Sequence, residues 1–447
     1  MPLHKIIPII SVIGVFASTT LQSFAGAGAS RMPVGEDQFQ AAMNYVPDSV
    51  DRKVRVTWQN EDEQHDLRIE GVDLIAEGLE AVVMALSKST HVKRVFLGNN
   101  KFLDEHSKGL RELTLTLQHH PSITVLSLSH NALMGNAAGY ISNTFLTQQG
   151  QQPYSGHLSA LDLSHVGMKS GGFKRLVKGL KNCPTLKELN VSGNPLGKGA
   201  GDCAADLIRT LDRDEKDKNL CRLRKLDISE CKLGPVGIEQ LCCGMWAADA
   251  IEELHLRDNV SRMNDVRELG AGISRGLYFF LNDMILMGGG ENPRIPMHTK
   301  TLKVLDVAGN HLGDKQAIVL IETVWKTCGK EKSDPWQLKK LILDRNGLTH
   351  HFVGMMVSKL IRAGFHWEKS SLELVSLRNN PIGESHIDGL VKLVKHAKFK
   401  RQPTETDDRL EGARPFSIDM TNTGVSAETW ELLERREGTE VLERLPH

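Results

Sequence analysis

One four-position pattern recurs along the 447-residue chain and constrains its fold more than any other feature. In the stretch LKELNVSGNPLG, residues 186–197, the apolar residues Leu186, Leu189 and Val191 precede Asn194. The alternation from Leu189 to Val191 predicts a short strand, because successive side chains of a strand point to opposite faces. The Gly-Asn-Pro sequence that follows predicts a turn that ends the strand at once.

The same spacing of three apolar residues and a fourth residue, usually asparagine, occurs nine times, which chance does not produce. Successive copies lie 28 to 51 residues apart and begin at residues 92, 123, 158, 186, 223, 251, 302, 338 and 372. A weaker copy, ARPFSIDMT, places Phe416 and Ile418 in one further strand. In eight copies the fourth position holds Asn100, Asn131, Asn194, Cys231, Asn259, Asn310, Asn346 and Asn380.

Amphipathic segments follow these strands, and GGFKRLVKGLKNCPTL at residues 171–186 is one that predicts a helix. This order of strand, turn and helix resembles the leucine-rich repeat family, and the 28-residue spacings resemble its ribonuclease-inhibitor-like subclass. The resemblance implies an α/β fold, a leucine-rich repeat solenoid (horseshoe) with a parallel concave sheet and outer helices. One repeat cannot bury its leucines alone, so stacked repeats share a continuous core. The asparagine is then expected to turn inward, where its amide bonds the backbone of neighbouring turns.

The array of repeats needs two ends. RKVRVTW at residues 52–58, followed by a helical stretch, predicts a degenerate first unit. SAETWELLERREGTEVLERL, starting at Ser426, predicts a closing helix with a polar outer face. The predicted organisation is an apolar N-terminal segment at 1–30, a linker at 31–50, an N-terminal cap repeat at 51–90, leucine-rich repeats at 91–400 with insertions at 136–157 and 260–300, and a loop and C-terminal capping helix at 401–447.

Composition and motifs argue against a catalytic role. Lys and Arg together number 55, as do Asp and Glu, so no overall field attracts nucleic acid, and no nucleic acid is predicted as a partner. The seven cysteines lack metal-ligand spacing and are predicted to be reduced core thiols. GNPLGKGAG resembles a phosphate-binding loop, but Gly193 and Gly197 enclose three residues instead of four. His130 and His165 occupy nearly equivalent positions in consecutive repeats but have no third ligand. The sequence therefore predicts no catalytic residue, no cofactor and no metal site.

Strand residues that point away from the core form the predicted concave face. At the central strand position, Asp162, Asn190, Asp227 and Asp306 give an acidic stretch through the middle repeats, and arginines make the C-terminal third more basic. Two interpretations stay open: a solvated face whose charges keep the sheet soluble, and a charge-complementary groove for a protein partner. The predicted partner-binding residues are Asp162, Asn190, Asp227, His255, Arg257, Asp306, Arg345 and Arg378.

An apolar segment near the N-terminus is predicted to be an anchor. Residues 6–27 carry no charge and, at 22 residues, are long enough to cross a bilayer. Retention in a membrane, with the mitochondrion as the favoured organelle, competes with removal of a secretory signal at Ala25-Gly-Ala27. A second apolar run, residues 277–287, is either a long core helix or a ridge that faces a partner. The predicted membrane or partner contacts are Ile6, Ile9, Ile10, Val12, Phe16, Phe279 and Phe280.

Together these features predict a non-catalytic protein–protein interaction scaffold. The first hypothesis is an accessory structural subunit of a larger membrane-associated complex, in the mitochondrion. The alternatives are a secreted or surface leucine-rich repeat recognition protein and a regulator, such as an inhibitor or a protein resembling GTPase activators. The predicted partner is a protein whose identity the sequence does not give.

Overall fold

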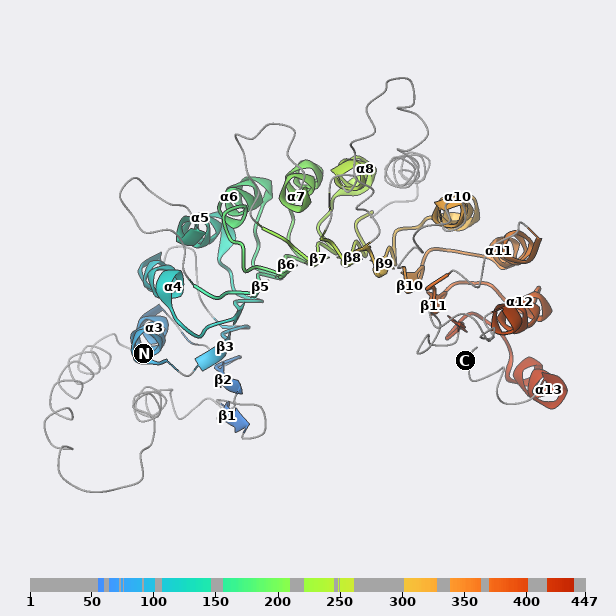
Figure 1. Ribbon diagram of the computed structural model, residues 1–447, viewed down its shortest axis with the longest axis horizontal. Coiled ribbons are helices and arrows are strands. Elements are labelled where there is room, and N and C mark those ends of the chain that lie inside the picture. Colours follow the sequence, from blue (N-terminus) through green and yellow to red (C-terminus); the bar gives the residue numbers. More distant parts are fainter. Residues whose placement is uncertain are drawn as a thin grey trace, which may run out of the picture.

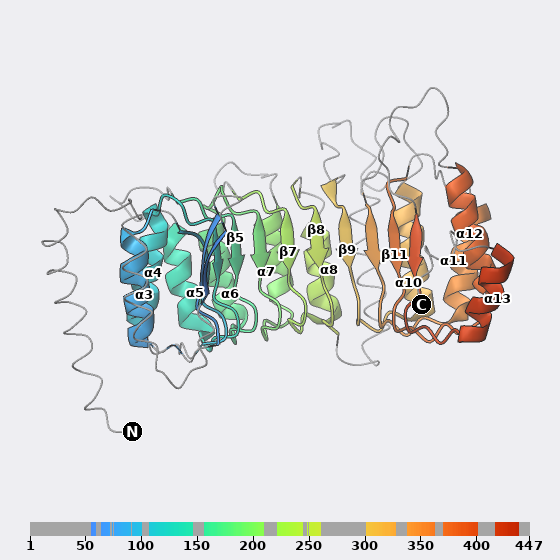
Figure 2. The same cartoon turned by 90° about the horizontal axis from the view of Figure 1, so that it is seen from below.

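The repeated apolar pattern folds into a curved solenoid, in which strands line the inner, concave side and helices line the outer side (Figure 1). The computed structural model describes residues 55–59, 64–71, 74, 76–90, 92–100, 107–145, 156–209, 221–244, 248, 250–260, 301–327, 338–362, 370–400 and 416–437. A second view shows the strands and the helices as two layers that run along the molecule (Figure 2). The predicted leucine-rich repeat solenoid is confirmed.

Twelve strands form one sheet within the described residues, in the order of the sequence. Neighbouring strands from β2 to β12 are parallel, as the repeat pattern requires. The strands are β1 (Arg55–Gln59), β2 (Gln64–Arg68), β3 (Val92–Phe96), β4 (Val125–Ser127), β5 (Ala160–Asp162), β6 (Glu188–Asn190), β7 (Lys225–Asp227), β8 (Glu253–His255), β9 (Val304–Asp306), β10 (Lys340–Ile342), β11 (Leu374–Ser376) and β12 (Ser417–Asp419).

Helices connect most of the strands and cover the outer side of the sheet (Figure 1). Their placement follows from the sequence, because each has an apolar side that packs against the sheet. They are α3 (Ala76–Lys88), α4 (Ser107–His119), α5 (Met134–Phe145), α6 (Ser170–Leu180), α7 (Ala200–Ile208), α8 (Gly234–Gly244), α10 (Gly313–Thr327), α11 (His350–Arg362), α12 (Ile387–Lys400) and α13 (Ala427–Glu437).

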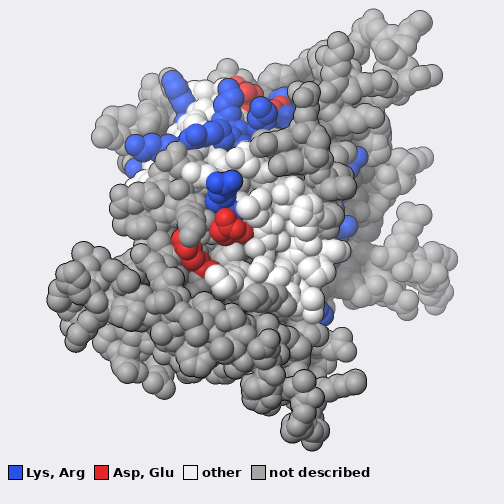
Figure 3. Space-filling model, turned by 90° about the vertical axis from the view of Figure 1, so that its left-hand side faces the viewer, with Lys and Arg blue, Asp and Glu red and all other residues white. Residues whose placement is uncertain are grey.

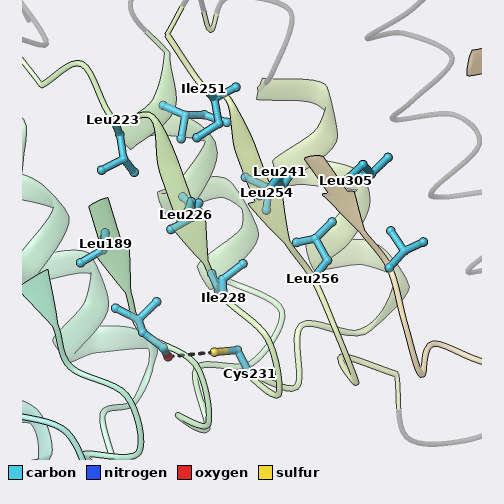
Figure 4. Packing of buried hydrophobic residues seen from close by; sticks show 14 of the residues in the cluster. Leu189, Leu223, Leu226, Ile228, Cys231, Leu241, Ile251, Leu254, Leu256 and Leu305 are labelled. Carbon is cyan, nitrogen blue, oxygen red and sulfur yellow. Dashed lines mark hydrogen bonds between the residues drawn. The ribbon is translucent and has the colours of Figure 1, made fainter. Parts of the chain in front are cut away.

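The core lies between the two layers and runs continuously through the repeats. Leu189, Leu226 and Leu254 are register partners in β6, β7 and β8, and none is more than 1% exposed. Leu241 of α8 belongs to the same buried cluster (Figure 4). Burying each leucine contributes about 1.5–3 kcal/mol to stability, so the repeats stabilise one another through this shared core.

In most repeats an asparagine turns inward beyond the end of the strand and bonds backbone groups of its own and the preceding repeat. Asn194, which is fully buried, donates from Nδ2 to the carbonyl oxygens of Leu163 and Val191, both at 2.8 Å. Its Oδ1 accepts the backbone N–H groups of Val166 (3.1 Å) and Met168 (2.9 Å). These bonds satisfy buried polar groups that the turn would otherwise leave unpaired.

Cys231 takes the asparagine position in the repeat of β7. Its thiol donates to the carbonyl oxygen of Val191 over 3.2 Å (Figure 4). Burial raises the pKa of Cys231 to about 12, so the thiol stays protonated and keeps the S–H group that donates this bond. A thiol thus replaces part of the asparagine's bonding.

The two ends differ in how closely they follow the sequence prediction. RKVRVTW contributes to β1, which pairs antiparallel with β2, so β2 and not β1 is the first strand of the parallel array. Leu67 and Ile69, each 1% exposed, supply the apolar pattern of this first repeat. At the other end α13 begins directly after Ser426, whose Oγ accepts the backbone N–H of Thr429 at 3.3 Å and caps the helix.

Residues 136–145 differ from the predicted organisation, which began an insertion at residue 136. They belong to α5, the outer helix of the β4 repeat, because Ala137, Ala138 and Ile141 are buried in the core. The predicted insertion at 260–300 lies outside the described residues, apart from Val260. Among the helices that the structure describes, none is long and apolar enough to cross a membrane.

Candidate functional site

The parallel register places one residue from each strand in a single row along the concave face. Asp162, Asn190 and Asp227 are consecutive partners in this row, followed by His255 and Asp306, as the sequence predicted. Neighbouring strands lie about 4.8 Å apart, so these side chains are close neighbours. From β2 to β12 the row is Arg68, Phe96, Ser127, Asp162, Asn190, Asp227, His255, Asp306, Ile342, Ser376 and Asp419.

A local hydrogen bond explains why Asp and Asn recur in this row. Asp162, Asn190 and Asp227 each accept, through Oδ1, the backbone N–H of the residue two positions later, at 2.9, 3.0 and 3.0 Å. The same bond forms at Asp306 (3.2 Å) and Asp419 (3.1 Å). An aspartate or asparagine at the end of a strand thereby fixes the turn that follows. This structural role was missing from the sequence analysis.

Asp306 lies at the centre of a buried ionic cluster. Its side chain has no exposed surface, and Arg257 Nε and His255 Nδ1 (3.3 Å) both bond Oδ2. Burial alone would raise the pKa of Asp306, but the hydrogen bonds from His255 and Arg257 outweigh it and lower the pKa. Asp306 is therefore an ionised carboxylate that links β9 to the neighbouring β8 repeat, which differs from its predicted role as an exposed partner contact.

His255 sits between acidic groups on this face. Its Nδ1 faces Asp306, and its Nε2 lies 3.6 Å from Oε2 of Glu253. Burial would lower the pKa of His255, but the hydrogen bond to Asp306 and the charges of Asp227 and Asp306 outweigh it and raise the pKa. Glu253 in turn lies 3.3 Å from Lys225 Nζ. The middle of the concave face is thus a network of coupled charges.

The predicted basic character of the C-terminal third is offset by local pairing. Arg257 pairs with Asp306, and Arg378 pairs with Asp419 of the neighbouring strand. Arg345 lies on the turn beyond β10 and bonds Oδ2 of Asp258 at 2.6 Å. Each of the three arginines therefore has a carboxylate beside it, which neutralises most of the positive charge expected there.

One glycine makes the long reach from Asp258 to Arg345 feasible. Gly309 occupies the intervening repeat with a φ of +67°, and a Cβ on it would lie 1.9 Å from Oδ1 of Asp258. The absence of a side chain lets the ion pair span a whole repeat. The equivalent position elsewhere carries His130 and His165, whose rings stack with centroids 4.4 Å apart. No group of three metal-ligating side chains occurs in the described parts of the chain.

Sequence reasoning missed the polar cluster at the N-terminal end of the row. Arg94 bonds both carboxylate oxygens of Asp66, at 2.5 and 2.8 Å. The guanidinium of Arg68 lies 3.7 Å from the ring centroid of Phe96. Assigning QHDLRIEG as the first repeat, from its Leu67 and Ile69, would have placed these side chains on the concave face.

Seven predicted contact residues cannot be placed on any surface, because they lie outside the described residues. They are Ile6, Ile9, Ile10, Val12, Phe16, Phe279 and Phe280.

Comparisons with known proteins agree with this geometry. The family model described as "Leucine Rich repeat" matches residues 182–201, 219–242 and 298–319. The chain is similar to the ribonuclease inhibitor of Sus scrofa, with 26% identity over 326 residues that cover 72% of this chain and 64% of that protein. It is also similar to the ribonuclease inhibitor of Mus musculus, with 23% identity over 374 residues that cover 71% of this chain and 75% of that protein. The chain therefore spans less than two thirds of the pig relative.

A solved structure of the Rad7 and Elc1 complex in yeast aligns with a TM-score of 0.43 and 13% identity, covering 81% of this chain and 71% of that chain. This likeness is too low to bear on function.

Proposed function

We propose that this chain, a leucine-rich repeat protein similar to ribonuclease inhibitors, is a non-catalytic scaffold whose concave face binds a segment of a protein partner. Repeats of this kind and the similarity to ribonuclease inhibitors support a protein-interaction scaffold. Solenoids of stacked repeats present extended concave surfaces that suit such binding.

The observation that carries the proposal is the row formed by Asp162, Asn190 and Asp227 on β5, β6 and β7. All three side chains keep part of their surface accessible. Asp162 and Asp227 are two strand spacings apart, which is about 10 Å. This geometry favours a partner segment that carries lysine or arginine side chains.

Removal of charge tests this proposal with a matched control. The double variant Asp162→Asn, Asp227→Asn removes two negative charges from the concave row and keeps the Oδ1 acceptor that fixes each turn, and Glu112→Gln, Glu428→Gln makes the same charge change on the exposed outer helices α4 and α13. Quantitative affinity purification should recover a stoichiometric protein with the wild type and with the outer variant, and lose it with the concave variant. Equal recovery with all three proteins would refute binding on this face.

We further propose that the scaffold is an accessory subunit of a membrane-associated assembly, in the mitochondrion, tethered by residues 6–27. The support is the uncharged 22-residue sequence of that segment. N-terminal sequencing of the native protein, followed by carbonate extraction of membranes, tests the tether. An N-terminus at residue 1 or 2 with resistance to carbonate supports it, and a mature N-terminus near Gly28 favours a secreted or surface protein instead.

A second candidate function, inhibition of a ribonuclease, is favoured by the similarity to two ribonuclease inhibitors. A fluorogenic RNA-cleavage assay with pancreatic-type ribonuclease and a molar excess of this protein tests it. Unchanged cleavage at micromolar concentrations would exclude that target.

A further inference from the structure

The outer side of the solenoid carries a positively charged surface on α6, far from the concave row. The sequence from residue 163 to residue 187 contains six Lys or Arg residues and no Asp or Glu. Within it, Lys174, Arg175 and Lys178 are exposed on α6. Figure 3 shows Lys and Arg gathered along the upper part of the side of the molecule that faces the viewer. The chain is neutral overall, so this charge is a local feature.

The core uses the whole apolar side of α6. Phe173, Leu176 and Leu180 have no exposed surface, and Val177 has 4%. The exposed side of α6 therefore carries charged side chains and no apolar side chain. Such a surface is poorly suited to insertion into lipid. Contacts to this surface must be mainly electrostatic.

Helix α5 lies next to α6 and presents an uncharged and open surface. No residue from Met134 to Phe145 is charged. Ser127 and Asp162 are register partners in β4 and β5, and Gly139 and Lys174 each lie twelve residues after one of them. Gly139 and Lys174 therefore occupy equivalent positions on adjacent helices. Apart from its chain neighbours and the nearby backbone of α5 itself, no atom lies within 4 Å of the position that a Cβ on Gly139 would take, so α5 is open to close approach there.

The contact between α5 and α6 is tight, which makes the surface a firm platform. A Cβ on Gly179 would lie 2.4 Å from the carbonyl oxygen of Ser142. Ser142 Oγ also donates to the backbone carbonyl of Arg175 over 2.7 Å. The cationic side chains therefore project from one helix, α6, that is locked against its neighbour α5.

On its other side α6 is bordered by negative charge. Asp202 and Asp206 are exposed on α7, and Asp206 pairs with Lys181 at 2.8 Å. Adjacent helix axes lie about 8–10 Å apart, so an anionic membrane or a nucleic-acid duplex on α6 would also meet the carboxylates of α7. A binding partner one helix wide avoids this repulsion. The surface thus favours an anionic partner one helix wide over an anionic membrane or a nucleic-acid duplex.

We propose that Lys174, Arg175 and Lys178, with the open surface at Gly139, form a docking surface for an acidic helical segment of a protein partner. Lys174 and Lys178 are four residues apart, so their side chains leave α6 on the same side. Glutamates spaced by four residues on the partner helix match that separation. The partner's carboxylates face α6. This surface is distinct from the concave row and leaves that row accessible.

Fluorescence anisotropy with a labelled 16-residue peptide of four Glu-Ala-Ala-Ala repeats tests the proposal. Binding to the full-length protein should weaken at least about tenfold in the variant Lys174→Glu, Lys178→Glu, and should decrease with added salt. The variant Arg111→Glu, Lys315→Glu makes the same charge change on α4 and α10 and should bind within about twofold of the wild type. Circular dichroism of each variant verifies folding.

Three outcomes would overturn the proposal. The first is equal loss of peptide binding in both variants, which would mean that only net charge matters. The second is unchanged binding of a control peptide with glutamine in place of glutamate. The third is tighter binding of phosphatidylserine vesicles or of a 30-nucleotide RNA than of the peptide, with the same dependence on Lys174 and Lys178, which would assign the surface to phosphate groups instead.

Discussion

Replacing Asn194 by alanine should destabilise the solenoid more than any exposed substitution nearby. The change removes an amide that is fully buried and bonded to five backbone groups of two repeats. Val191 keeps a bond from the thiol of Cys231 to its carbonyl oxygen, so the main loss falls on the N–H groups of Val166 and Met168. A buried donor without a partner costs about 1–3 kcal/mol, so these two N–H groups predict a loss of about 2–6 kcal/mol.

Urea unfolding at 25 °C, followed by circular dichroism, measures this loss. Lys198→Ala is the control, because Lys198 is exposed four residues away and its substitution should change stability by less than about 0.5 kcal/mol. Hydrogen exchange adds a local measure, since the amides of Val166 and Met168 should exchange faster in the Asn194 variant. A free energy of unfolding within about 1 kcal/mol of the wild type, with unchanged exchange at both amides, would refute this account of the asparagine position.

Three further substitutions test the ionic cluster around Asp306 and the close contact at Gly309. Asp306→Ala leaves Arg257 and His255 without their shared carboxylate and should lower the free energy of unfolding by about 2–3 kcal/mol; an unchanged urea midpoint would contradict this. Since the pKa of His255 is raised in the fold, its protonation stabilises the fold fully below pH 6.5, and this contribution is lost as the pH rises through the folded pKa. His255→Gln should remove that pH dependence from thermal melts. Gly309→Ala should destabilise by about 1–3 kcal/mol more than Gly347→Ala, because both have positive φ but only Gly309 meets a neighbouring carboxylate oxygen.

The repeat architecture could be predicted because the periodic pattern is local. Leu189, Val191 and Asn194 lie within six residues of one another, and their spacing requires no knowledge of distant parts of the chain. The parallel register then followed from aligning the copies, and it placed Asp162 beside Asn190 as the structure does. Periodicity thus determined both the fold and the composition of the concave row.

The pairing of charges could not be predicted in the same way. Arg257 reaches Asp306 across 49 residues of sequence, Arg378 reaches Asp419 across 41, and Arg345 reaches Asp258 across 87. Each pair depends on the side-chain path over a neighbouring repeat, and the third also depends on the missing side chain of Gly309. A residue at the end of a strand can serve a turn, an ion pair or a partner, and its sequence position does not distinguish among the three.

Two kinds of bond distinguish the part of the concave row that links neighbouring repeats from the part that keeps its charge. Asp306 is neutralised by Arg257 and His255, whereas Asp162 and Asp227 accept backbone N–H groups, which bond a carboxylate without cancelling its charge. The field over β5 to β7 therefore stays negative, which favours the cationic partner proposed above. Because the charge of Asp227 acts on His255, protonation of that imidazole weakens the negative field at the edge of the row. Binding of a cationic partner should accordingly tighten as the pH rises through the pKa of His255, and His255→Gln should remove this dependence. Titration calorimetry from pH 5.5 to 8 with the partner recovered by affinity purification would measure it, and an affinity that falls with rising pH in the wild type would contradict the assignment.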